Sequence, residues 1–171
     1  MGEGRASVPR SSMRLYLLRH AEASPLKIGE YDRDRALTAE GGALMRRLGH
    51  AITAAGWKPG LIISSPYLRA RQTARLVAEA LQVSPETDAL LIPGFSLQDL
   101  EEVVSRQTVT DQVMIVAHQP SLGQVVMALT GASVAFHPGT LAVIETQRLR
   151  HRNGVLYGLY QPDVLAGLGG I

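Results

Sequence analysis

Four basic side chains that could hold and attack a phosphoryl group follow three short runs of apolar residues. They are Arg19 and His20 after residues 15–18, Arg69 shortly after residues 61–64, and His118 after residues 113–117. Arginine presents a planar fork of donors that matches phosphate oxygens, and it keeps its charge. A neutral imidazole can attack phosphorus and carry the phosphoryl group, whereas a protonated imidazole can donate to a phosphoryl oxygen. We therefore predict that His20, next to Arg19, is a nucleophile and that His118 is a protonated donor.

The elements that must position these side chains are the three apolar runs. Each run reads as a strand buried on both faces, and helix-length segments separate them, which is typical of an α/β protein. The carboxyl ends of parallel strands meet at one edge of a sheet, where such proteins place ligands. A lone histidine after a strand is more often structural, but three coincident strand ends favour one shared anion site. Of the other histidines, His50 and His151 are predicted to be inert, and His137 could border the cleft.

The rest of the chain alternates predicted helices and strands, with capping and turn residues at their ends. In chain order we expect a helix from the N-cap Thr38 to residue 55, a helix over 68–81, a strand in the segment 86–92 with its apolar core at 89–92, a short helix opened by a capping box of Ser96 and Asp99, a helix after Pro120, and strands over 141–145 and 155–160 joined by a turn at Asn153-Gly154.

Composition narrows the class of function. The 171 residues are predicted to form one domain over 13–171, with a flexible tail at 1–12 and a loose end at 166–171. Cysteine is absent and no histidine pair stands at ligand spacing, so we expect no disulfide, metal or cofactor. No apolar run approaches the roughly 20 residues of a membrane span. A net charge of +2 without a long basic block argues against a nucleic-acid partner. We expect a cytoplasmic monomer.

Four motifs resemble those of the histidine phosphatase, or phosphoglycerate mutase-like, superfamily. Residues 18–23 (LRHAEA) resemble its Arg-His-Gly signature, 35–41 (RALTAEG) its Arg-Pro-Leu-Thr-x-x-Gly element, 64–74 (SSPYLRARQTA) its Ser-Pro-x-x-Arg-Ala-x-Gln-Thr element, and 116–122 (VAHQPSL) the second-histidine element of small SixA-type phosphohistidine phosphatases. The motifs occur in the family order between residues 15 and 145.

This resemblance implies a three-layer α/β/α sandwich with a mostly parallel central sheet, as in phosphoglycerate mutase. It implies that His20 is the nucleophile and that the other catalytic residues, Arg19, Arg69 and His118, form a phosphate pocket. Arg35 would be an added phosphate or substrate contact. The resemblance implies neither a metal nor a cofactor, and phosphate or another oxyanion would bind in the pocket.

Two departures from the family pattern bear on the substrate. Ala21 replaces the usual glycine after the nucleophile, and residues 89–98 lack the general-acid glutamate of larger members. Glu22, a candidate substrate contact, or Asp99 could still reach the leaving group. Because an alkoxide leaves phosphorus poorly without a nearby acid, we expect a phosphohistidine on a protein of the histidine-phosphotransfer type as substrate. The alternatives are a small-molecule phosphomonoesterase of the same superfamily and, less favoured, an inactive phosphate-binding module.

Overall fold

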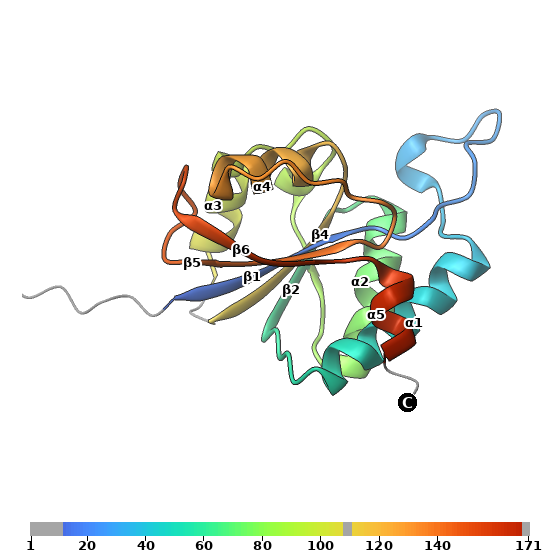
Figure 1. The fold of residues 1–171 in the computed structure, drawn as a ribbon. Coiled ribbons are helices and arrows are strands. Elements are labelled where there is room, and N and C mark those ends of the chain that lie inside the picture. The colour runs from blue at the N-terminus through green and yellow to red at the C-terminus, as the bar shows by residue number, and fades with distance from the viewer. Residues whose placement is uncertain (1–11, 108–110, 169–171) are drawn as a thin grey trace, which may run out of the picture.

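The computed structural model describes residues 12–107 and 111–168, and its centre is a sheet of six strands (Figure 1). The strands are β1 (Met13–Arg19), β2 (Leu61–Ser64), β3 (Glu86–Thr87), β4 (Gln112–Ala117), β5 (Leu141–Thr146) and β6 (Gly154–Tyr160). Their order across the sheet is β3-β2-β4-β1-β5-β6. The first four are parallel to one another, and β5 is antiparallel to both of its neighbours. The predicted mostly parallel central sheet is confirmed.

Helices cover both faces of this sheet (Figure 1). The helices are α1 (Ala39–Ala54), α2 (Leu68–Leu81), α3 (Leu97–Ser105), α4 (Ser121–Thr130) and α5 (Pro162–Leu168). One face packs against α1, α2 and α5, and the other packs against α3 and α4. The three-layer α/β/α arrangement expected from the sequence is therefore present. None of the described helices is long and apolar enough to cross a membrane.

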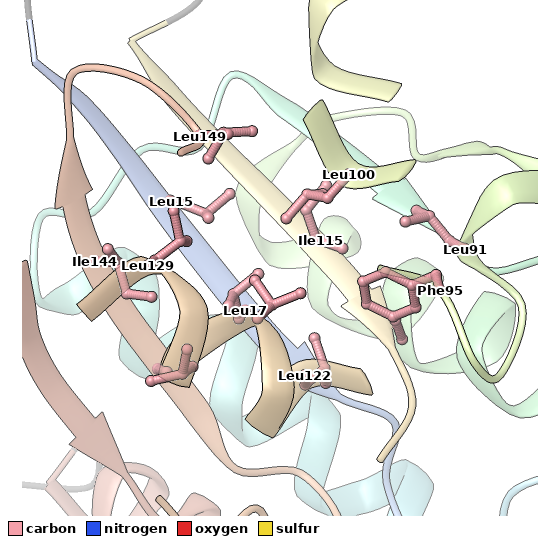
Figure 2. Packing of buried hydrophobic residues seen from close by; sticks show 14 of the residues in the cluster. Leu15, Leu17, Leu91, Phe95, Leu100, Ile115, Leu122, Leu129, Ile144 and Leu149 are labelled. Atoms are coloured by element: carbon pink, nitrogen blue, oxygen red, sulfur yellow. The ribbon is translucent and has the colours of Figure 1, made fainter. Parts of the chain in front are cut away.

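The central strand β1 shows why its apolar run forms a strand. Side chains alternate across a strand, so Leu15 and Leu17 face α3 and α4, whereas Tyr16 and Leu18 face α1 and α2. All four are completely buried. Figure 2 shows the cluster of buried residues on the α3 and α4 face, in which Leu15 and Leu17 lie among leucines of these two helices. A run that is apolar at every position therefore buries side chains in the cores on both faces of the sheet.

The predicted helix starts are also present. The side chain of Thr38 accepts a hydrogen bond from the Gly41 amide at the start of α1. Ser96 and Asp99 form the predicted capping box at the start of α3, since each side chain bonds the other residue's backbone amide. These caps bond amides that the first helical turn leaves without an intrahelical partner, which is why they can be read locally.

The strand predicted in the segment 86–92 forms only at the start of that segment, and its predicted core at 89–92 is wrong. The Asp88 carboxylate accepts from the Leu90 amide at 2.9 Å and turns the chain into a short 3-10 helix, η2 (Ala89–Leu91). Leu91 alone of the apolar run is fully buried, and 44% of Ile92 is exposed. The sheet edge is instead formed two residues earlier by β3 (Glu86–Thr87), which pairs with β2.

The hairpin between β5 and β6 forms, but not through a turn at Asn153-Gly154. Gly154 already belongs to β6, and the left-handed residue of the connection is Arg152, with φ 57°. The Thr146 hydroxyl donates to the Arg148 carbonyl, and the Asn153 side chain accepts from the Arg148 amide. Asn153 therefore closes a longer loop as an acceptor.

The predicted loose end at 166–171 is wrong in part, because α5 continues to Leu168. The pairing of Thr140 with Gln161, at 2.8 Å between side-chain oxygens, holds the entry to this helix against the start of β5. The remainder of that prediction, residues 169–171, lies outside the described residues. So does the predicted N-terminal tail, except for Ser12.

Candidate active site

Three parallel strand ends bring the predicted side chains together. In the sheet register Arg19 lies beside Ala117, and Ser64 lies beside Val116, so β1, β4 and β2 end at the same edge. The residues that follow these ends are His20, His118 and the segment that leads to Arg69 in the first turn of α2. The ring centroids of His20 and His118 are 5.2 Å apart. The convergence predicted from the strand pattern is therefore what the fold produces.

The converging side chains line a cavity of about 420 Å³. All six residues predicted for catalysis or substrate binding border it. Its lining consists of Arg19, His20, Glu22, Ala23, Asp32, Arg35, Arg69, Pro93, His118, Gln119 and Pro138. Asp99, which the sequence left open as a possible acid, does not border the cavity, because its carboxylate is held by Ser96 in the capping box. His137 is exposed and does not line the cavity, although the next residue, Pro138, does.

The His20 ring is held in one tautomer. Its Nδ1 lies 2.8 Å from the Ala21 carbonyl oxygen, which can only accept, so Nδ1 carries the proton. Nε2 is left with a lone pair and accepts a bond of 3.2 Å from Arg69 Nε. Burial lowers the pKa of His20 to about 4, and the nearby arginines act in the same direction, although the Ala21 bond opposes them. At neutral pH the ring is thus uncharged, with Nε2 available as a nucleophile.

The His118 ring is buried more deeply. Its Nε2 lies 2.7 Å from the Ser65 hydroxyl, and its Nδ1 has no hydrogen-bond partner among the described residues. Burial lowers the pKa of His118 to about 3, and His20 adds to this effect. Without an anion in the cavity, His118 is therefore neutral at neutral pH, in contrast to the protonated donor predicted for it. A phosphoryl dianion beside the ring would raise this pKa again.

The three arginines present their guanidinium groups from different elements. Arg19 donates from Nη1 to the Phe136 carbonyl at 2.7 Å, and its buried Nε has no partner among the described residues. Arg69 is 5% exposed and lies at the beginning of α2. Arg35 is fixed by a bond from Nε to the Ser24 carbonyl at 2.8 Å. Two of the cations come from strand and helix ends, and the third comes from the loop before α1.

Asp32 is the site residue that the sequence analysis missed. Its carboxylate lies 3.0 Å from Arg69 Nη2 and 3.0 Å from Arg35 Nη1, and its carbonyl accepts from Arg69 Nη1 at 2.7 Å. Burial raises the pKa of Asp32, but the bonds from Arg35 and Arg69 outweigh it and bring the pKa below its usual value. The available signal was an acidic residue three positions before Arg35 in a polar loop. It does not reveal the pair with Arg69.

The second cavity carboxylate is Glu22, which is exposed at the mouth and accepts from the Thr38 hydroxyl at 3.2 Å. Two carboxylates therefore border the cavity, although the stretch over residues 89–98 contributes none, as predicted. Among the described residues no group of three or more His, Cys, Asp or Glu is arranged to hold a metal ion. The cavity is instead suited to a tetrahedral oxyanion, because its arginines and imidazole nitrogens supply donors.

Comparison with known proteins points to one superfamily. Residues 15–92 match the model of the histidine phosphatase superfamily (branch 1). The chain is 32% identical to an uncharacterised protein of Picosynechococcus over 73% of its own length and 78% of that protein. It is 29% identical to a SixA phosphohistidine phosphatase homologue of Haemophilus influenzae, over 76% and 86% of the two chains. An uncharacterised chloroplastic protein of Arabidopsis thaliana is 27% identical, and the match spans 78% of this chain and 66% of that protein.

Solved structures share the fold. The putative phosphohistidine phosphatase SixA of Agrobacterium tumefaciens superposes with a TM-score of 0.75 at 25% identity, over 88% of this chain and 98% of that one. A SixA protein histidine phosphatase complexed with tungstate superposes with a TM-score of 0.78 at 23% identity, over 90% of this chain and 99% of that one. Phosphoglycerate mutase of Bacillus anthracis gives 0.73 at 12% identity, over 95% and 99%, so the phosphoglycerate mutase-like fold is confirmed. With the four motifs and the arrangement of His20, His118 and the arginines, these matches show that the chain belongs to the histidine phosphatase superfamily.

Proposed function

We propose that the protein is a phosphohistidine phosphatase that works through a covalent phosphohistidine on His20. The observation that carries this proposal is the His20 ring itself. It is neutral, its Nδ1 proton is committed to the Ala21 carbonyl, and its Nε2 lone pair lies in a cavity lined by three arginines and a second imidazole. A phosphoryl group drawn in by the arginines would meet that lone pair.

In the first step Nε2 of His20 forms a bond to phosphorus while the bond from phosphorus to the substrate nitrogen breaks. The electron pair of the broken bond returns to the substrate imidazole, which takes up a proton from solvent. The Nε2 lone pair that attacks is the one that accepts from Arg69 Nε, so this N–H turns from Nε2 to a phosphoryl oxygen as the bond to phosphorus forms. Arg19 and Arg69 offset the charge on the transferring group, which is the main source of catalysis in phosphoryl transfer.

In the second step water attacks the phosphorus of phosphorylated His20. The bond from phosphorus to Nε2 breaks, its electron pair returns to the ring, and inorganic phosphate leaves with the protons of the water shared between phosphate and solvent. The bond from Nδ1 to the Ala21 carbonyl supports this cycle, since it keeps the same nitrogen facing the cavity. The Ala21 amide is itself held by the Thr73 hydroxyl at 3.1 Å, so the main chain behind His20 is fixed.

The protonation states of the carboxylates support phosphohistidine over an alkyl phosphate as substrate. Asp32 is the carboxylate that contacts Arg69, and its lowered pKa keeps it ionised and makes it a poor proton donor. An alkoxide needs a donor at this point, whereas an imidazole leaves readily once solvent has protonated it. The SixA relatives, described as phosphohistidine phosphatases, point to the same substrate class. The partner would then be a protein that displays a phosphorylated histidine.

Trapping the intermediate tests the nucleophile. During turnover of a histidine-phosphotransfer protein carrying labelled phosphohistidine, denaturation should leave acid-labile, alkali-stable label on this protein. His20→Ala should abolish both label and turnover. The matched control is His137→Ala, which removes an exposed ring outside the cavity and should retain both. Label that persists in His20→Ala would exclude His20 as the nucleophile.

A small-molecule phosphomonoesterase remains the second candidate, and Glu22 is the observation that favours it. Its carboxylate is exposed at the cavity mouth, where it could protonate an alkoxide. Comparing kcat/KM for the phosphohistidine protein with kcat/KM for simple alkyl phosphates separates the two. We expect the protein substrate to be preferred. Equal or faster turnover of the alkyl esters, lost in Glu22→Gln, would establish the phosphomonoesterase instead.

A further inference from the structure

Ser65, immediately after β2, is a buried residue that contacts the second histidine of the site. It is 0% exposed, and its hydroxyl oxygen lies 2.7 Å from His118 Nε2. The sheet sets this distance, because β2 and β4 are parallel neighbours and the Ser65 amide continues their ladder by donating to the Val116 carbonyl at 2.9 Å. Ser65 does not line the cavity, so it acts on His118 from behind.

The direction of this hydrogen bond follows from the other partner of the hydroxyl. The Tyr67 amide donates to Ser65 Oγ at 3.3 Å, and an amide nitrogen cannot accept. If His118 Nε2 also donated, the hydroxyl proton of a fully buried serine would lack an acceptor among the described residues. Buried donors are rarely left in that state, because the lost hydrogen bond to water is not replaced. The Ser65 hydroxyl therefore donates and His118 Nε2 accepts.

A neutral imidazole carries one proton, and an accepting Nε2 places that proton on Nδ1. Nδ1 of His118 is buried, has no hydrogen-bond partner among the described residues, and belongs to a ring that lines the cavity. We propose that Ser65 is a positioning residue that holds neutral His118 as the Nδ1–H tautomer, so that the ring donates to a bound oxyanion without first gaining a proton. This inference rests on the proposed function, and it specifies how the site recognises the phosphoryl group.

The electrostatics of the site make such a device useful. Burial and the neighbouring His20 disfavour the cationic form of His118, and its pKa of about 3 leaves the ring neutral at physiological pH. A donor that depended on protonation would be missing when the substrate arrives. By holding His118 as the Nδ1–H tautomer, the Ser65 hydroxyl lets the ring donate without carrying a positive charge. The ring can still gain a proton later.

The tautomer can be observed directly. In protein labelled with ¹⁵N at the histidine rings, we expect His118 to show a protonated Nδ1 and an unprotonated Nε2 near neutral pH. Ser65→Ala removes the donor to Nε2, so the Nε2–H tautomer of His118 should appear, whereas Ser65→Thr keeps a hydroxyl and should restore Nδ1–H. The matched control is Ser64→Ala. Ser64 is also buried, but its hydroxyl donates to the Ser65 carbonyl and leaves His118 unaffected.

Tungstate binding supplies the functional readout without any turnover. Loss of one donor to a charged oxyanion should weaken tungstate binding by about 10-fold or more in Ser65→Ala, with recovery in Ser65→Thr. Ser64→Ala should stay within about 2-fold. If Ser65→Ala fails to fold, the tautomer of His118 in the wild-type protein and in Ser65→Thr still tests the role of Ser65.

A wild-type His118 protonated on Nε2, or a folded Ser65→Ala variant with unchanged tautomer and unchanged tungstate affinity, would overturn the role of Ser65. Both readouts are independent of the substrate. Failure to hydrolyse phosphohistidine while the tautomer and tungstate results hold would therefore refute the proposed function and leave this inference standing.

Discussion

Acid should charge the two site histidines only well below the pH at which histidine normally titrates. With the pKa of His20 at about 4, roughly 90% of that ring is still neutral at pH 5, whereas an ordinary histidine with a pKa of about 6.5 would be only about 3% neutral. The nucleophile must be neutral, so this difference corresponds to about 30-fold in the fraction of active enzyme at pH 5.

The two rings should also titrate as a pair. Burial is the largest cause of the shift for each, and their ring centroids lie 5.2 Å apart. At an effective dielectric constant of about 20, two unit charges at this separation repel by about 3 kcal/mol, which is about two pKa units. The second proton therefore binds at still lower pH than the first, and the apparent pKa values belong to the pair.

Proton NMR of the histidine ring signals between pH 8 and 4 measures this titration. The chain has five histidines, and replacing the exposed His50, His137 and His151 with glutamine leaves only the two site rings. We expect both rings to keep their neutral signals down to about pH 5, and the acid limb of kcat/KM to fall near pH 4. Added phosphate should move the titration upward, because an anion stabilises the imidazolium. Titration of His20 at pH 6 or above in the folded protein without added anion would refute the reasoning.

Three further predictions address the arginines, the packing of α1 on α2, and metals. Arg69→Lys keeps a charge but loses the planar fork that contacts His20 and Asp32, so kcat should fall by about 10²-fold or more, and near-normal kcat would place Arg69 outside the reaction. Gly49→Ala should lower the free energy of unfolding in urea by about 1–3 kcal/mol, because the new Cβ would lie 2.9 Å from the Val77 carbonyl oxygen. In the control, Gly42→Ala in the same helix, the new Cβ would meet only Leu76 Cδ1 at 3.6 Å, so this variant should be neutral or stabilising. An equal loss of unfolding free energy in both variants would contradict the packing argument. Phosphatase activity should persist in excess chelator, and loss that a divalent ion restores would contradict a site made of arginine and histidine donors.

Much of the sheet and of the arrangement of its site could be predicted from local pattern. A run that is apolar at every position can only be an inner strand or a buried helix, and residues 15–18 are too short for a helix. Once three such runs are parallel, their carboxyl ends share one edge, so Arg19, His20 and His118 must lie near one another. The caps at Thr38 and Ser96 could also be predicted from the sequence, because a cap bonds a residue only three positions away.

The two wrongly predicted elements show where local sequence pattern no longer predicts the backbone conformation. Residues 89–92 have the composition of a strand, but the Asp88 side chain offers the Leu90 amide a local partner that a strand would not use. Asn153-Gly154 has the composition of a tight turn, but Thr146 and Asn153 close a longer loop through side-chain bonds. In both places a side-chain hydrogen bond, worth about 1 kcal/mol, decides between backbone conformations of similar energy.

The sequence by itself determined which arginines and histidines reach the site, because strand ends and motif spacing are properties of the chain. Only the tertiary structure decided their chemical state. The pair between Asp32 and Arg69 joins residues 37 positions apart, and the bond between Ser65 and His118 joins residues 53 apart. The neutrality of His20 and His118 depends on burial beneath several elements at once. Desolvation and charge interactions are set by everything within a few ångströms in space, and this neighbourhood exists only after the sheet and its helices have packed.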